Sequence, residues 1–128
     1  MARPADVLAR REREREELLG LARAYVAGLS QRVTVIAAAV VGSVARGDFN
    51  VWSDVDVVVI AEELPERTPE RAALLSAGAP GRVQPVGFRP DEFDAAQRKG
   101  NRLAREASDA GVVLTGADFF RQRSRSTS

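Results

Sequence analysis

The alternation of apolar and polar positions predicts a long helix at the start of the chain. Apolar residues recur at spacings of three and four, as on one face of a helix: Leu18, Leu21, Ala22, Tyr25, Val26 and Leu29. No proline interrupts residues 5 to about 29, so we predict that this stretch is helical. Residues 10–17 alternate Arg and Glu, which is typical of a solvent-exposed helix face, although a helix that projects this far could also contact a partner.

Runs of β-branched residues predict the strands. Residues 33–41 and 55–60 are apolar almost throughout and indicate strands buried on both faces. Residues 82–88 form a weaker run, because Pro85 cannot donate to a sheet ladder and implies an edge strand, a bulge or a local break. A last short strand is predicted over residues 112–114.

Two further helices are predicted from their start and stop signals. Pro69 suits the first position of a short helix over residues 68–77. A longer helix is predicted to follow Pro90 over residues 91–110, with Gly111 as its stop.

The length of the chain bounds its domain organisation. A chain of 128 residues can bury one core and rarely divides it. We therefore expect one α/β domain over residues 1–116, with its core between residues 33 and 114. The polar residues 117–128 are expected to form a disordered tail.

The residue inventory excludes several kinds of chemistry. The chain has no cysteine and no histidine, so disulfides, thiol nucleophiles, iron–sulfur clusters, the usual zinc sites and serine triads are absent. Catalysis would have to come from carboxylates, hydroxyls, arginines or backbone amides. A bound metal would have oxygen ligands, which favours magnesium, manganese or calcium.

The charge balance indicates neither a nucleic acid nor a membrane partner. There are 19 basic and 18 acidic residues, a formal net charge of +1, so the overall field attracts neither ligand strongly. The longest apolar run, residues 35–41, is too short to cross a bilayer, and the first residues lack the apolar core of a signal peptide. We expect a soluble cytoplasmic protein.

Residues 40–60 carry the most informative chemistry. A buried strand runs into Gly42 and Ser43, and the next buried strand begins with Asp54 and Asp56. Gly42 would let a ligand approach the backbone, and a helix that starts there would direct free N–H groups at an anion. Alternate residues of a strand project to the same face, which brings the two carboxylates together.

The carboxylate pair has two interpretations. Two like charges at the start of an apolar strand are unfavourable unless something neutralises them, and a divalent cation does so directly. Alternatively, both side chains cap the strand and face solvent. The Gly-Ser turn upstream favours the first interpretation, so Asp54 and Asp56 are the predicted metal ligands and catalytic residues.

The spacing from Gly42 to Asp56 resembles a known signature. Gly-Ser-x10-Asp-x-Asp is the pattern of the nucleotidyltransferases of the DNA polymerase beta superfamily, and the small size resembles their minimal (MNT) branch. Gly47 and Ser53 also stand where members commonly carry Gly and Ser. The resemblance covers residues 33–114, and it implies a short mixed sheet with helices packed on one side.

The resemblance implies an activity and a set of site residues. Members transfer a nucleoside monophosphate from a triphosphate, here expected to be ATP, to a hydroxyl group and release pyrophosphate. The residues implied in nucleotide binding are Gly42, Ser43, Gly47 and Ser53. Asp54 and Asp56 would coordinate two Mg²⁺ ions. Arg46 is a further candidate for phosphate binding, and otherwise an ordinary surface arginine.

The resemblance also implies a partner. Minimal members pair with small helical HEPN-domain proteins as antitoxin and toxin, and active members adenylylate the partner on a tyrosine. A HEPN-domain protein is therefore the expected partner. Trp52 precedes the carboxylate pair and either packs against the protein or stacks on a base.

One position departs from the family pattern. Members carry a third carboxylate on a following strand, and Gln84 stands at that position here. Glutamine can coordinate a metal through its carbonyl oxygen, but it supplies neither negative charge nor a base. Asp91 or Asp94 would substitute only in a different register, and both suit the first turn of a helix better. The alternatives are therefore a weak or inactive binding module of the same fold, or an α/β domain that binds no nucleotide.

Overall fold

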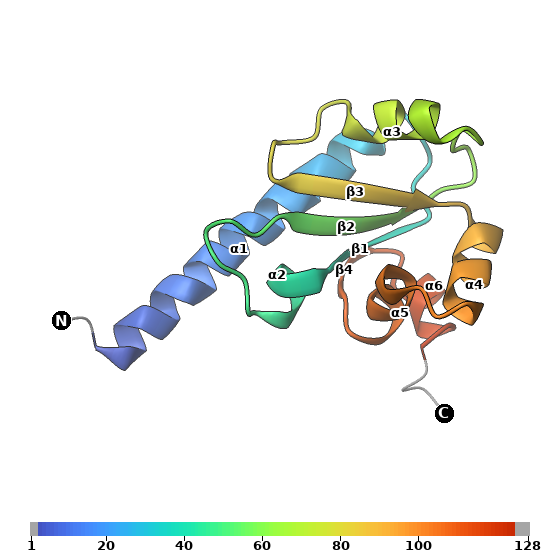
Figure 1. Ribbon diagram of the computed structural model, residues 1–128. Helices are drawn as coiled ribbons and strands as arrows, with labels where there is room; N and C mark the ends of the chain where they lie inside the picture. Colours follow the sequence, from blue (N-terminus) through green and yellow to red (C-terminus); the bar gives the residue numbers. More distant parts are fainter. Residues whose placement is uncertain (1–2, 125–128) are drawn as a thin grey trace.

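A four-stranded sheet in the order β3-β2-β1-β4 forms the centre of the molecule (Figure 1). The computed structural model describes residues 3–124. The elements in chain order are α1 (Pro4–Leu29), β1 (Ala37–Val41), α2 (Gly42–Arg46), β2 (Val55–Ile60), α3 (Thr68–Ser76), β3 (Val83–Phe88), α4 (Pro90–Arg98), α5 (Arg102–Asp109), β4 (Val112–Thr115) and α6 (Ala117–Arg121).

The sheet is mixed. β1 pairs antiparallel with both β2 and β4, whereas β2 pairs parallel with β3 after a crossover through α3. The predicted α/β fold class is therefore confirmed. β3 lies at an edge of the sheet, where a proline is tolerated although it has no N–H group to donate. The edge position is thus the correct one of the three explanations for Pro85.

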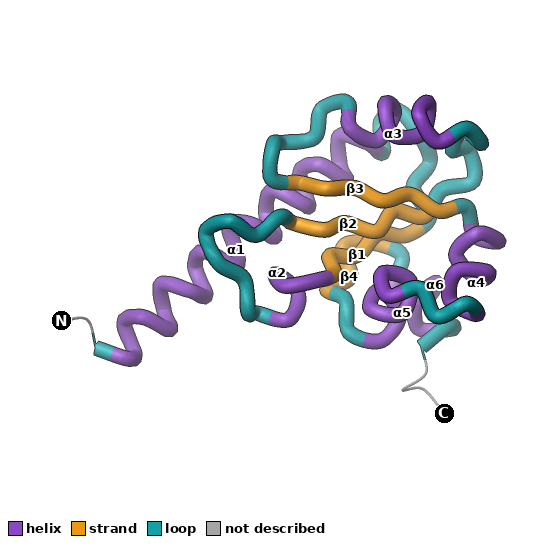
Figure 2. The backbone as a smooth tube through the Cα atoms, in the orientation of Figure 1, coloured by secondary structure: helices purple, strands orange, loops and turns teal. Residues whose placement is uncertain are grey.

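Helices cover both faces of the sheet, so their predicted packing on one side is wrong. α1 and α3 bury Leu19, Leu29 and Leu75 against one face, and this cluster includes Val40 and Val57. α4, α5 and α6 pack on the other face, where a second apolar cluster joins the strands to these helices. It includes Val41, Val58, Phe93, Ala107 and Phe120. Figure 2 shows α1 passing behind the sheet while α4, α5 and α6 gather on the other side. Strands that are buried on both faces read as nearly continuous apolar runs, as residues 55–60 do.

The long helix predicted over residues 91–110 is two helices. α4 ends at Arg98, and Gly100 has a φ of +80°, which a helix cannot contain. Asn101 then starts α5 by accepting a hydrogen bond from the N–H of Ala104 at 3.1 Å. The turn lets α4 and α5 pack at different angles against the same face.

The segment after Gly116 is not a disordered tail over the described residues. Ala117–Arg121 form α6, and Phe120 is buried beside Phe93, with ring centroids 5.9 Å apart. Phe119 and Phe120 are the apolar residues that indicate an ordered segment here, but the polar residues around them favoured the prediction of a disordered tail. Residues 125–128, the rest of the predicted tail, lie outside the described residues.

The remaining predicted elements differ at their ends. The first helix begins and ends within one residue of its predicted range, but β1 spans five residues and not the nine predicted over 33–41.

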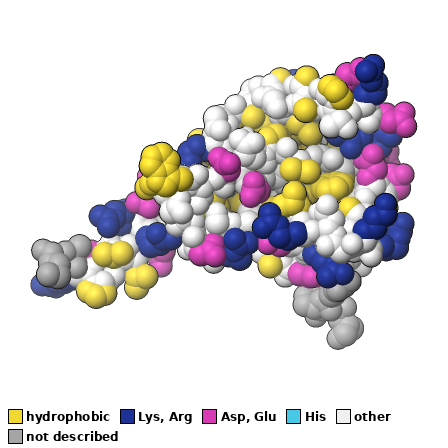
Figure 3. Space-filling view, in the orientation of Figure 1, with side chains coloured by type: hydrophobic (Ala, Val, Ile, Leu, Met, Phe, Trp, Pro, Cys, Tyr) yellow, Lys and Arg dark blue, Asp and Glu magenta, His cyan; other side chains and the backbone are white. Residues whose placement is uncertain are grey.

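Over residues 3–124, none of the helices is both long and apolar enough to span a membrane. Side chains of both charge signs are scattered over the face shown in Figure 3.

Candidate functional site

Gly42 and Asp56 meet where β1 ends. The β1–β2 register pairs Val41 with Asp56, so the carboxylate lies beside the first residue of α2. Gly42 has a φ of +77°, and a Cβ atom there would lie 2.7 Å from Oδ2 of Asp56. Both the backbone conformation and the approach of the carboxylate therefore require glycine.

Asp54 and Asp56 form a carboxylate pair that no described side chain neutralises directly. Asp54 is exposed, Asp56 is half-buried, and neither accepts a hydrogen bond or forms an ion pair with residues 3–124. Burial raises the pKa of Asp56, the charge of Asp54 raises it further, and the positive charge of Arg102 offsets part of the effect. The carboxylate of Asp56 is thus an anion that a cation would stabilise.

Two carboxylates are an adequate protein contribution to a Mg²⁺ site. Mg²⁺ prefers oxygen ligands and is commonly held by one or two carboxylates together with substrate phosphates. Asp54 and Asp56 therefore fit such an ion. Within the described part of the chain, no group of three carboxylates is close enough to hold a metal without further ligands.

Gln84 lies next to the carboxylate pair. The parallel register of β2 and β3 pairs it with Asp56, and its side chain is exposed. The position expected for a third carboxylate is thus beside the other two, but it carries an amide. Asp91 lies in the first turn of α4, and Asp94 is engaged by Arg123 at 2.6 Å. Neither residue takes the place of the missing carboxylate.

Ser43 and Gly47 shape the short helix α2. The carbonyl of Ser43 accepts hydrogen bonds from the N–H groups of Gly47 at 2.8 Å and Asp48 at 3.1 Å. Its hydroxyl makes no hydrogen bond to any described residue. Gly47 has a φ of +89° and ends the helix, so its backbone forms the turn after α2.

The turn before β2 fixes Ser53 and exposes Trp52. The hydroxyl of Ser53 accepts a hydrogen bond from the N–H of Asn50 at 2.9 Å, and its carbonyl accepts one from Arg82 at 2.7 Å. Ser53 therefore organises the loop that leads to Asp54. Trp52 is 87% exposed, which excludes the interpretation that it packs against the protein.

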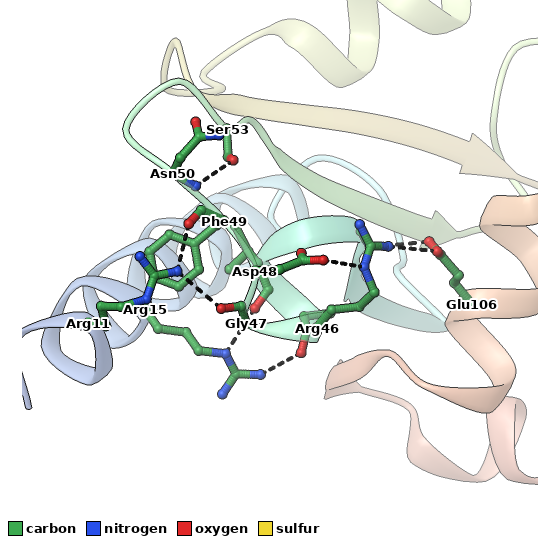
Figure 4. A network of polar contacts seen from close by, with 12 residues as sticks. Arg11, Arg15, Arg46, Gly47, Asp48, Phe49, Asn50, Ser53 and Glu106 are labelled. Carbon is green, nitrogen blue, oxygen red and sulfur yellow. Dashed lines mark hydrogen bonds and ion pairs between the residues drawn. The ribbon is translucent and has the colours of Figure 1, made fainter. Parts of the chain in front are cut away.

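Arg46 and Gly42 share a carboxylate that the sequence did not indicate. Glu106 of α5 accepts a hydrogen bond from the N–H of Gly42 at 3.2 Å and pairs with Arg46 at 3.0 Å (Figure 4). Arg46 also contacts Asp48 at 3.3 Å. Glu106 lies 64 residues after Gly42 in the chain, and only the packing of α5 against β1 brings it to the site.

Arg11 and Arg15 connect α1 to α2 and to the loop that follows it. Arg15 donates to the carbonyls of Val44 at 2.9 Å and Ala45 at 2.8 Å. Arg11 donates to the carbonyl of Phe49 at 2.7 Å and stacks over its ring at 4.6 Å. Figure 4 shows both side chains reaching from α1 to this segment. Both arginines belong to the alternating charged run, which gave no sign of these contacts.

Comparison with known proteins points to one family. The sequence matches the family described as nucleotidyltransferase domain over residues 23–108. Among solved structures, it is similar to a candidate nucleotidyltransferase from Sulfolobus solfataricus, with 23% identity and a TM-score of 0.59, over 66% of this chain and 78% of that chain. This second likeness concerns the fold. The comparison with curated proteins gives no match.

Proposed function

The chain belongs to the nucleotidyltransferase domain family, and we propose that it transfers AMP from ATP to a hydroxyl group of a protein partner. The observation that carries this proposal is the carboxylate pair at the start of β2, with Asp54 directly before the strand, Asp56 within it, and Gly42 against Asp56. Two carboxylates that have no partner among residues 3–124, next to a turn that admits no side chain, suit a nucleotide bound through Mg²⁺.

The proposed reaction exchanges a phosphoanhydride bond of ATP for a phosphoester bond to the acceptor. The acceptor oxygen forms a bond to the α-phosphorus of ATP, the bond from that phosphorus to the bridging oxygen breaks, and pyrophosphate leaves. Asp54 and Asp56 would hold Mg²⁺, which neutralises charge on the triphosphate oxygens. Arg46 and the hydroxyl of Ser43 are within the same segment and would bind phosphate oxygens. The acceptor proton would go to water or a neighbouring carboxylate, because the amide of Gln84 is not a base.

We extend the proposal to the biological role. The resemblance to the minimal branch supports a HEPN-domain protein as the acceptor and an antitoxin role for this chain. The exposed Trp52 and Val51 beside Asp54 provide a surface on which such a protein could lie. The tyrosine hydroxyl of the partner would then be the acceptor.

Gln84 supports a second candidate function, a nucleotide-binding or partner-binding module with little catalysis. Its side chain lies in register with Asp56, where a carboxylate would complete the metal site. Without that carboxylate the site loses one negative charge and the nearest base. This candidate retains ATP binding but predicts slow or absent transfer.

A transfer assay distinguishes the two candidates. The protein is incubated with Mg²⁺, ATP labelled on the α-phosphate, and the product of any neighbouring HEPN gene. The first candidate predicts label on the partner, lost in Asp54→Asn and Asp56→Asn. Asp48→Asn is the matched control, since Asp48 is an exposed carboxylate in the same region. ATP binding without transfer contradicts the first candidate and supports the second.

Introducing a third carboxylate at position 84 tests whether Gln84 limits the transfer rate. If Gln84 limits catalysis, Gln84→Asp increases the transfer rate, whereas Gln84→Ala does not. An unchanged rate in Gln84→Asp would mean that the limiting group lies elsewhere. Absence of any ATP-induced or Mg²⁺-induced stabilisation in a thermal melt would contradict both candidates.

A further inference from the structure

Glu106 contacts two groups that belong to the proposed nucleotide site. One oxygen accepts the N–H of Gly42 at 3.2 Å, and the other pairs with the guanidinium of Arg46 at 3.0 Å. A backbone amide and a guanidinium that converge on one anion are a common phosphate-binding arrangement. The carboxylate of Glu106 therefore takes, within the protein, the position of a phosphate group.

The location of Glu106 makes this contact a fixed part of the site. α5 is held against the sheet by Ala104 and Ala107, which are both buried. The side chain of Glu106 is only 22% exposed, although Arg46 is 45% exposed. Arg102 lies one turn earlier on α5, and its charge acts on Asp56. α5 thus presents one cationic and one anionic side chain to the carboxylate pair.

The single N–H of Gly42 cannot serve Glu106 and a phosphate at once, whereas Arg46 has further N–H groups besides the Nη1 that contacts Glu106. A triphosphate that approached Gly42 would meet the carboxylates of Asp54, Asp56 and Glu106. Mg²⁺ bound to the nucleotide can offset the first two, but Glu106 is engaged by protein donors that the phosphate needs. Binding therefore requires that one anion replaces the other.

We infer that Glu106 is a positioning residue, which keeps the Gly42 amide and the Arg46 guanidinium oriented in the free protein and yields the Gly42 amide when a nucleoside triphosphate binds. This inference rests on the proposed function. Glu106 sets the affinity of the site, since each binding event replaces its contact with Gly42. It takes no part in the bonds that form and break.

Glu106→Gln tests the inference because it removes the charge and keeps the shape of the side chain. The dissociation constant of ATP is measured by calorimetry with Mg²⁺, and KM and kcat by the transfer assay. We expect about ten-fold tighter ATP binding and a lower KM with unchanged kcat, from the loss of one like charge near the triphosphate. Asp48→Asn is the matched control, since Asp48 also pairs with Arg46 but does not contact Gly42.

A change of ATP affinity in the opposite direction overturns the inference. Weaker ATP binding, or a lower kcat, in Glu106→Gln would make Glu106 a ligand or a structural support of the site. Glu106→Ala must change ATP affinity in the same direction, and it serves if the first variant does not fold. If the wild type binds ATP and neither variant binds it more tightly, only this inference fails. If no protein binds ATP, CTP, GTP or UTP, the proposed function fails with it.

Discussion

A Cβ atom on Gly42 would stand 2.7 Å from Oδ2 of Asp56, on the neighbouring strand. Two separate constraints therefore require glycine at position 42: the backbone φ of +77° and the carboxylate beside it. These two constraints predict different consequences for stability and for activity, and a second glycine with positive φ, outside the candidate site, separates them.

Gly42→Ala is expected to abolish Mg²⁺-dependent nucleotidyl transfer at a moderate cost in stability. The left-handed backbone costs an alanine about 1–2 kcal/mol, and the added methyl group turns the carboxylate of Asp56 away. Gly78→Ala is the matched control, since Gly78 has a φ of +76° and its added Cβ would meet only Nη2 of Arg32, at an ordinary 3.8 Å. Urea unfolding should give similar losses for the two variants, whereas only Gly42→Ala should lose transfer. Equal activity of the two variants would contradict this reasoning.

Arg11 and Arg15 of α1 are expected to stabilise α2 and the loop that follows it. Arg15→Ala and Arg11→Ala each remove charge-assisted hydrogen bonds to part-buried carbonyls, and each should lower the free energy of unfolding by about 1 kcal/mol. Arg23→Ala is the control, because its ion pair with Glu16 is exposed and contributes about 0.5 kcal/mol or less. Amide exchange in residues 44–49 should accelerate in the first two variants and not in the control.

The single tyrosine, Tyr25, should ionise at a higher pH than a free tyrosine, and its ionisation should reduce the stability of the fold at alkaline pH. Burial raises the pKa of Tyr25 to about 12, although the charge of Arg32 acts in the opposite direction. Since the folded pKa exceeds the unfolded value of about 10, this contribution is present below pH 10 and is lost as the pH rises towards 12. Ultraviolet absorbance of tyrosinate measures the titration directly.

Tyr25→Phe separates the two roles of the hydroxyl. The variant loses the hydrogen bond to the carbonyl of Leu75, which measures 2.6 Å, and should be about 1 kcal/mol less stable at pH 7. Its stability should fall less between pH 10 and 12 than that of the wild type. The same alkaline slope in both proteins would show that Tyr25 ionises freely.

Glu92 should contribute to stability on the acid side. Burial acts to raise its pKa, but hydrogen bonds from Arg71 at 2.8 Å and from the N–H of Arg89 at 2.7 Å lower it overall. A lowered pKa means stability that is present above about pH 4.5 and lost as the pH falls through the folded value. Glu92→Gln should lower the free energy of unfolding by about 1 kcal/mol at pH 7, a value discounted for partial exposure. Its stability should also fall less than that of the wild type as the pH is lowered from 7 into the acid range. Glu70→Gln, at an exposed pair with Arg67, should match the wild type.

α6 should be required for the stability of the domain. Phe120 is buried against Phe93, and Phe120→Ala should cost about 3–4 kcal/mol because it opens a cavity. Asp118→Ala changes an exposed residue of the same helix and should lie within about 0.5 kcal/mol of the wild type. Urea unfolding at pH 7 measures both. Small losses for both variants would mean that residues 117–121 are dispensable.

The strands could be predicted because burial on both faces leaves a clear mark in sequence. Residues 55–60 are apolar throughout apart from Asp56, and β2 has the predicted bounds. The predicted helix over 91–110 failed because its apolar stripe continues across Gly100, whose positive φ breaks the helix. The helix at 117–121 was missed because its two phenylalanines are surrounded by polar residues.

The candidate site could be predicted only where it is local in the chain. Gly42, Asp54 and Asp56 lie within fifteen residues of one another and form a recognisable pattern. The residues that engage this segment from elsewhere, Glu106 and Arg15, belong to helices whose charged positions look like ordinary solvent-facing ones. Only the tertiary packing of α5 and α1 brings them to it.

The exposed indole of Trp52 supplies a built-in optical reporter. The chain has one tryptophan, it is 87% exposed, and it precedes Asp54 by two residues. Its fluorescence therefore comes from a single place and starts from a water-exposed state. Any ligand or protein that covers the loop shifts or quenches that emission, so binding can be followed in the unmodified protein without a dye.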